Sequence, residues 1–274
     1  MKNTISPKRI LVLLVVTFLV VSISACSSGE YGTADTSNRQ AVDALQEPEE
    51  QQDVGDLETK PAEDLVSKEE RMSAEITQTA LQVWKDSIDT IWAHGAIEIT
   101  NTGDVPIEIG DISISFVGDD NSILGTSTMI LPVPEIILPG ETAYAGDSTI
   151  IEGIDDPTEI VNMEANIDFD KTDKQPQILD VQDLKIIPSD YGRTKITGRV
   201  VNTSQENADD IRIVIALFDE NDKLLGIYRE SPSVTLAPGK NMGFETSYPG
   251  IDVEGFIDKV SKLVGKAFNW KFDF

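Results

Sequence analysis

Few side chains in this sequence have the type and spacing that catalysis requires. The chain contains one cysteine, Cys26, and one histidine, His94, which lies next to Gly95 and close to Trp92. A Ser-His-Asp set needs a serine within hydrogen-bonding distance of the histidine, and no G-x-S-x-G turn supplies one. No glycine-rich phosphate loop is present either. We therefore expect His94 to lie at the edge of a strand, and we expect no catalytic residue, no cofactor and no enzymatic activity.

Acidic clusters raise two further possibilities. The segments Asp119-Asp120-Asn121 and Asp219-Glu220-Asn221-Asp222 carry oxygen ligands for calcium, but they lack the alternating ligand order of a calcium loop. Asp and Asn also favour hairpin turns, because their side chains bond to the nearby backbone, so we expect turns and no metal site. The pairs Asp155-Asp156 and Asp168/Asp170 would serve a glycosidase only across a cleft of defined width. We expect them to lie on solvated edges.

The composition limits the class of protein. A hydrophobic content of 40% is enough for folded domains, and we expect Trp84, Trp92 and Trp270 to pack in or beside their cores rather than form a ligand platform. The formal net charge of −26 opposes binding to nucleic acid, because phosphate contacts need Lys and Arg. The same charge repels anionic lipid head groups. We therefore expect the folded part to stand off a membrane rather than lie on it.

The N-terminal segment differs from the rest of the chain. A basic start precedes an apolar run, Ile10–Ile23, that ends in Ile23-Ser24-Ala25-Cys26. A spanning helix usually needs about 20 apolar residues, so this shorter run favours a cleaved secretory signal over a transmembrane helix. The small residues Ser24 and Ala25 fit the cleft of a signal peptidase. Residues 1–25 are thus predicted to be a signal peptide.

This ending resembles the lipobox of bacterial lipoproteins. The resemblance implies a diacylglycerol thioether on Cys26, cleavage between Ala25 and Cys26, and usually acylation of the new amino terminus by a chain such as palmitate. Two or more acyl chains anchor a protein stably, because each buried methylene contributes roughly 0.8 kcal/mol. An ordinary signal peptide with a chance cysteine, or an uncleaved anchor, is the alternative. In a cell with two membranes, Ser27 after Cys26 lacks the Asp associated with inner-membrane retention, which favours the outer membrane.

Residues 26–73 are predicted to be an acidic, disordered tether. They are rich in Glu, Asp, Gln, Ser and Thr, and they have no sustained apolar period. Like charges extend such a chain, so the segment would act as a spacer between the bilayer and the folded part.

The remainder repeats one pattern at a spacing of about 101 residues. In each copy a strand ends in Asn-Thr, and an alternating strand, an acidic turn, a Leu-Gly pair and a Pro-Gly turn follow. Short strands separated by turn signals predict an all-β antiparallel sandwich in each copy. We therefore predict two tandem immunoglobulin-like domains, residues 74–172 and 173–274, with one short helix near Phe256–Val264 in the second. The matched pairs are Asn101/Asn202, Ile112–Phe116/Ile211–Ile215, Leu124-Gly125/Leu225-Gly226, Pro139-Gly140/Pro238-Gly239 and Met163–Phe169/Val264–Trp270.

The pattern resembles the FxLYD-type domain of bacterial surface lipoproteins, which has an immunoglobulin-like sandwich fold. The second copy carries it best, in Ile215-Ala216-Leu217-Phe218-Asp219, where Ile215 and Phe218 replace the Phe and Tyr of the motif. The first copy departs further, with Ile114-Ser115-Phe116-Val117-Gly118 at that place. The resemblance covers roughly residue 74 to the C-terminus and implies a fold but no catalytic residues.

Together these features favour a lipid-anchored, extracytoplasmic protein without enzymatic activity. Its partner would be an envelope protein or a wall polymer, which exposed sheet edges can bind by adding a strand. The alternative is a lipoprotein that captures a metal ion or small solute, which would need a cleft between the two copies. A hydrolase is the third possibility, and it lacks the necessary His and Cys chemistry.

Overall fold

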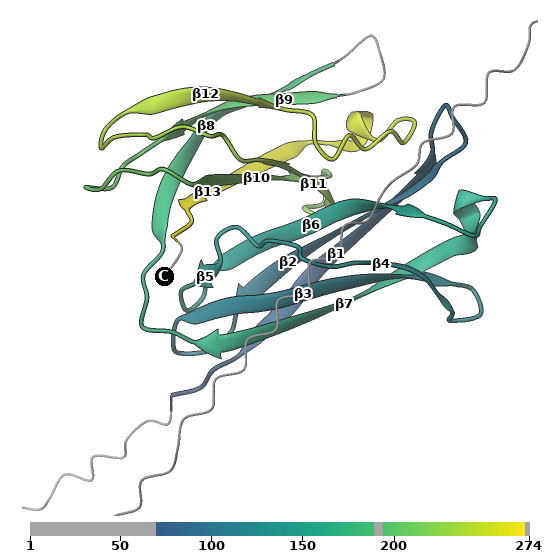
Figure 1. Ribbon diagram of the computed structural model, residues 1–274, viewed down its shortest axis with the longest axis horizontal. Helices are drawn as coiled ribbons and strands as arrows, with labels where there is room; N and C mark the ends of the chain where they lie inside the picture. Colours follow the sequence, from purple (N-terminus) through teal and green to yellow (C-terminus); the bar gives the residue numbers. More distant parts are fainter. Residues whose placement is uncertain (1–69, 189–193, 272–274) are drawn as a thin grey trace, which may run out of the picture. The chain divides into compact units, whose positions relative to one another are not determined.

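The structure of the protein is a computed structural model that describes residues 70–188 and 194–271 (Figure 1). The predicted signal peptide, Cys26 and residues 26–69 of the predicted tether lie outside the described residues. Within the described ranges, no helix is long and apolar enough to cross a membrane. The last predicted tether residues contact the first sheet, because the Ser73 carbonyl accepts hydrogen bonds from the backbone N–H groups of Thr102 and Gly103.

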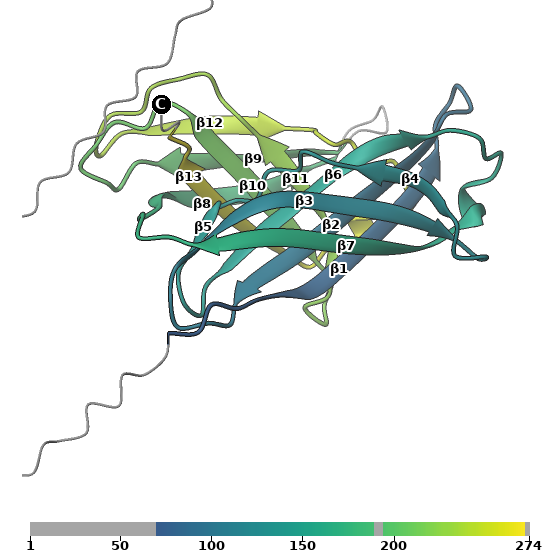
Figure 2. The ribbon, with the colours of Figure 1, turned by 60° about the horizontal axis from the view of Figure 1, so that its bottom comes forward.

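The first copy of the repeat forms two antiparallel sheets. Strands β1 (Ala74–Lys85), β2 (Ile91–Asn101) and β6 (Thr142–Ile151) form one sheet in the order β1-β2-β6. In the other sheet, β3 (Ile107–Gly118) pairs with β4 (Ile123–Ser127), β5 (Ile136–Ile137) and β7 (Ile160–Lys171). A 3-10 turn, η1 (Pro157–Glu159), precedes β7. Figure 2 shows β3 and β7 in front of β1 and β2.

The second copy uses the same strand sequence in a continuous sheet. Its order is β11-β10-β13-β8-β9-β12, with β8 (Gln177–Ile187) paired at its start with β13 (Lys262–Asn269) and further on with β9 (Lys195–Val201). Strands β10 (Ile211–Phe218), β11 (Leu224–Glu230) and β12 (Asn241–Thr246) complete it. Because β8 pairs on both sides along different parts of its length, it joins the layer β11-β10-β13 to the layer β9-β12.

The predicted antiparallel all-β fold is confirmed. Strands such as β7 alternate between core and surface as predicted, whereas the centre of β2 is buried on both faces. In β2, for example, Ala93, Ile97 and Ile99 are fully buried. They belong to a core shared by both sheets of the first copy, which also contains Ile114 and Phe116 of β3. A second core, which includes Ile196, Val200, Ile213, Ile215 and Phe244, lies between the layers of the second copy.

The helix expected near Phe256–Val264 is only a single 3-10 turn, η2 (Ile257–Lys259). Val260 already has an extended backbone, with φ −78° and ψ 118°. From Lys262 onward the chain pairs with β10, so Val264 lies opposite Ala216. The predicted short helix before the last strand is thus present as this one 3-10 turn, but it does not extend to Val264, because the strand contacts outweigh the helical spacing of a few apolar side chains.

The Asn-Thr repeat has a structural cause at the atomic level. Asn101 and Asn202 are both fully buried, although their side chains are polar. In each copy the Nδ2 amide donates to the carbonyl four residues later and to the carbonyl that precedes the Pro-Gly segment, at 2.7–2.8 Å. The backbone of the same Asn also bonds to the turn itself, where Gly140 and Gly239 have φ of 79° and 71°. Each Asn therefore fixes the loop after its strand to the Pro-Gly turn.

Candidate functional site

The two copies meet at a contact between sheets, which we call the seam. The outer face of β1-β2-β6 packs on the outer face of β10, β11 and β13, and Figure 1 shows β10 and β11 alongside β6. Tyr144 and Phe218 contact each other edge to face, with ring centroids 6.0 Å apart. As a result, the described residues of both copies belong to one compact unit. The apolar part of the seam consists of Ala80, Ala96, Val133 and Tyr144 from the first copy and Val214, Ala216, Phe218, Leu224, Ile227 and Phe268 from the second.

His94 lies at the centre of the seam and not at a strand edge, so that expectation was wrong. It is fully buried in the middle of β2, the central strand of its sheet. The Ile227 backbone N–H donates to His94 Nε2 at 3.2 Å, and His94 Nδ1 lies 3.0 Å from Ser148 Oγ. Because Nε2 accepts, the proton of the neutral ring is on Nδ1. Burial, and secondarily the charge of Arg229, lowers the pKa of His94 to about 3. The ring is therefore a neutral structural acceptor.

Side chains of the first copy also cap the free edge of β11. This strand pairs with β10 on one side only, so its other edge exposes backbone groups that need partners. The Gln82 amide donates to the Leu225 carbonyl at 2.9 Å, and the Leu224 N–H donates to Gln78 Oε1 at 2.8 Å. Together with His94, these two glutamines supply hydrogen-bond partners to backbone groups on the free edge of β11, although all three side chains lie on the face of the other sheet. Sequence reasoning missed all of these contacts.

An ion pair between the two copies lies near His94 in the seam. Arg229 on β11 forms an ion pair with Asp147 on β6 at 2.8 Å, and the Tyr248 hydroxyl donates to the same carboxylate at 2.7 Å. The Arg229 guanidinium also lies 4.7 Å from the centroid of the Tyr248 ring. Burial, followed by the bond to Asp147, raises the pKa of Tyr248. The ion pair thus connects β6 to β11 and to the loop after β12.

Several pockets are lined by residues of both copies, and we call the one of about 280 Å³ beside Tyr248 the pocket at the seam. Trp84 and Trp92, which are cross-strand partners on β1 and β2, stack with centroids 6.2 Å apart and an angle of 8° between their planes. The loop 247–252 of the second copy forms the opposite wall with Tyr248 and Asp252. The predicted packing is confirmed, because both tryptophans contact the core of the second copy and Trp270 contacts the seam cluster. Contrary to the expectation that none would line a ligand site, Trp84 and Trp92 also line this pocket. The lining residues are Trp84, Asp86, Trp92, Ser148, Ser247, Tyr248, Pro249, Gly250 and Asp252.

The acidic turns are hairpin turns. The Asp219 carboxylate accepts hydrogen bonds from the Asn221 and Lys223 N–H groups at 2.8 and 2.9 Å, and Asp120 accepts from Ser122 at 2.9 Å. Asn121 and Asp222 have φ of 63° and 58°, as the tight turn requires. In the part of the chain that the structure describes, no group of three or more His, Cys, Asp or Glu side chains is placed to hold a metal ion.

The two carboxylate pairs do not face each other across a cleft. Asp156 caps η1, where its Oδ1 accepts from the Thr158 N–H at 2.8 Å. Asp168 and Asp170 are exposed on the same face of β7. These positions agree with the expectation of solvated edges.

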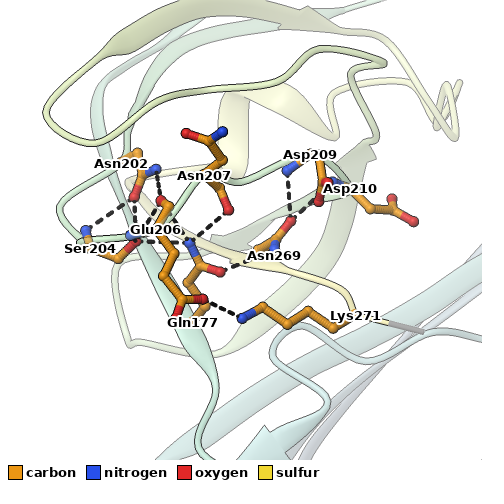
Figure 3. A network of polar contacts seen from close by, with 9 residues as sticks. All are labelled: Gln177, Asn202, Ser204, Glu206, Asn207, Asp209, Asp210, Asn269 and Lys271. Atoms are coloured by element: carbon orange, nitrogen blue, oxygen red, sulfur yellow. Dashed lines mark hydrogen bonds and ion pairs between the residues drawn. The ribbon is translucent and has the colours of Figure 1, made fainter. Parts of the chain in front are cut away.

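A polar network in the second copy fixes the loop between β9 and β10 (Figure 3). Gln177, at the start of β8, donates to Ser204 Oγ at 2.8 Å and accepts from the Asn269 amide at 3.0 Å. Asn269 Oδ1 in turn accepts from the backbone N–H groups of Asp209 and Asp210. Because its polar side chains bond to one another and to the loop backbone, this network is structural, and the pocket at the seam is the stronger candidate for a ligand.

No protein-family model matches the chain, and a search of curated proteins finds no match either.

Proposed function

We propose that this chain is an extracytoplasmic lipoprotein, anchored to the membrane through Cys26, whose two sandwich copies have a binding or accessory role in the cell envelope without catalysing a reaction. The observation that carries the proposal is the placement of the only cysteine directly after Ser24-Ala25 and the apolar run. Such a run with a small-residue cleavage site is typical of export.

The pocket at the seam lies at the far end of β1 from the start of the described chain. The chain enters the first sheet next to Ser73, which bonds to Thr102 and Gly103 at the end of β2. A strand of 12 residues spans about 40 Å, so the turn after Lys85 lies at the opposite end of the sheet. The pocket at the seam, which Trp84 and Asp86 line, also lies at that end. Trp84 and Asp86 therefore lie at the end of the first sheet that is far from the point where the described chain enters it.

Mass spectrometry of the native protein tests the anchor directly. We expect the mature chain to begin at a Cys26 that carries lipid, and we expect a Cys26→Ser variant to leave the membrane fraction. Ser27→Ala, which leaves the cysteine in place, is the matched control and should stay membrane-bound. An intact Met1 or an unmodified thiol on the native chain would overturn the proposal.

A protein partner or wall polymer is the first candidate ligand of the sandwich copies. Among the described residues, β7 pairs only with β3 and β12 pairs only with β9, so each has an edge that can add a strand. Crosslinking in cells followed by purification through the protein tests this role. Enrichment of one envelope component with this protein supports the role. Recovery of the same component in equal amount with an unrelated lipoprotein as bait would contradict it.

A solute-binding role is the second candidate, and the pocket at the seam is the observation that favours it. Small-molecule sites are concave, and they occur preferentially where two compact parts of a protein meet. This pocket combines aromatic walls with a few polar groups, as such sites do.

A further inference from the structure

The geometry points to a specific ligand class for the pocket at the seam: a small organic cation with an alkylated ammonium head group. The inference rests on the solute-binding role, to which it assigns a ligand, and it does not depend on the lipid anchor. Three features of the lining carry it: its aromatic rings, its carboxylates and its size.

Aromatic rings form much of the wall. Trp84 is 7% exposed and Trp92 is half-buried, so the protein holds both indoles in place before any ligand binds. Tyr248 on the facing loop is 46% exposed. Indole and phenol faces attract cations through their quadrupoles, and quaternary ammonium groups are bound in this way. The Arg229 guanidinium already lies over the Tyr248 ring, so the two indoles are the main aromatic contacts for a ligand cation.

The charges in the lining select a cation. Asp86 and Asp252 are the ionisable acids that line the pocket, and no Lys or Arg is among the lining residues. Within residues 70–188 and 194–271, neither carboxylate forms an ion pair with a basic side chain. The charge of Arg229 is offset by Asp147, which it contacts at 2.8 Å. A cation entering the pocket therefore meets an uncompensated negative field.

The hydrogen bonds of Asp86 favour an alkylated ammonium over a sugar. Its Oδ1 accepts from the Ile88 and Thr90 N–H groups, and its Oδ2 accepts from the Trp92 indole N–H, at 2.9–3.0 Å. Few acceptor positions therefore remain on Asp86 for the hydroxyls of a sugar, whereas its charge stays available to a cation. An alkylated ammonium needs no hydrogen bonds, and a cavity of about 280 Å³ suits a small head group.

Calorimetric titration of the full mature chain with choline tests the proposal. A polyoxyethylene detergent keeps the lipidated protein in solution and contains neither a cation nor a sugar. We expect saturable binding of choline and a change in tryptophan fluorescence. 3,3-Dimethylbutan-1-ol has the shape of choline without its charge, and we expect it to bind at least roughly tenfold more weakly.

Variants locate the binding in the pocket. Asp252→Asn removes an exposed charge, so it should keep the fold and weaken choline binding severalfold. Trp92→Leu removes one aromatic wall and should weaken it roughly tenfold or more. Asp111→Asn changes an exposed carboxylate on β3 and is the matched control, expected to bind as the wild type does. Melting temperatures of all variants identify any loss of binding that is caused by unfolding.

Phosphocholine distinguishes the two sources of this chemistry, because it adds the phosphate of a lipid head group. Weaker binding than choline assigns the site to a free solute, and equal binding assigns it to a head group; either result supports an alkylammonium site. The proposal is overturned if choline gives no heat, if the neutral analogue binds equally well, if Asp252→Asn binds as the wild type does, or if glucose binds where choline does not. The lipid anchor is tested by the mass of the modified Cys26, which does not depend on choline binding. Failure of this proposal and failure of the anchor are therefore distinguishable.

Discussion

Acidification is expected to destabilise the fold through His94. This imidazole accepts a hydrogen bond from the Ile227 N–H in the fully buried seam. Protonation of Nε2 would place two donors against each other and bury a charge beside Arg229. The native state therefore resists the proton, whereas the unfolded chain takes it up freely.

The size of the effect follows from the two pKa values. The pKa of His94 is about 3 in the folded chain and 6.5 in its ordinary environment. Above pH 6.5 both states are neutral and His94 adds no pH dependence. Between pH 6.5 and about 3 only the unfolded state binds the proton, so the free energy of unfolding falls by roughly 1.4 kcal/mol per pH unit. At pH 4.5 the loss from this residue should reach roughly 2–3 kcal/mol.

Denaturant unfolding at pH 7.0, 6.0, 5.0 and 4.5 measures this loss, and a His94→Gln variant isolates it. The Gln carbonyl offers an acceptor to the Ile227 N–H and does not titrate. The carboxylates titrate in both proteins and change the stability of both equally. The difference between the two slopes of unfolding free energy against pH therefore belongs to His94, the only histidine in the chain. Parallel stability curves for wild type and variant down to pH 4.5 would refute the reasoning.

Two further changes test the contacts that hold each copy and the seam. Asn202→Ala should lower the free energy of unfolding by roughly 1–3 kcal/mol, because two hydrogen bonds from a buried amide, to the carbonyls of Glu206 and Leu236, are lost. Exposed Asn207→Ala is the control, and equal unfolding midpoints for the two variants would contradict the role of the buried amide. Phe218→Ala should cost roughly 3–5 kcal/mol, because Phe218 is 3% exposed in the seam cluster. Thermal unfolding measures this loss, and Met129→Ala, at a side chain that is 88% exposed, is the control. A fall in melting temperature no larger than that of the control would show that the seam is not tightly packed.

The internal repeat made most of the fold predictable. Asn101 and Asn202 recur because each buried amide fixes the same loop to the same Pro-Gly turn. The alternation of apolar residues placed the strands, and the Asp219 turn behaved as its side chain predicts. These features are local, so a sequence pattern carries them. The helix near Phe256 is shorter than its apolar spacing suggested, since pairing with β10 decides the backbone from Lys262 onward.

The seam could not be predicted, because the repeat conceals which sheet face is buried. His94 and Ala96 lie in the seam, whereas Lys195 and Thr197 occupy the matching positions of the second copy outside its core. Only the difference between the copies marks the buried face, and a strand pattern with period two treats the two faces alike.

What the sequence by itself determined is the all-β class and the positions of the strands and turns, because each depends on residues close together in the chain. The export signal that ends at Cys26 is a prediction of the same local kind. The tertiary structure decided the packing of the two copies, the neutral state of His94 and the pocket between Trp92 and Asp252. Those features join residues more than 100 positions apart, and they exist only where side chains of the two copies meet.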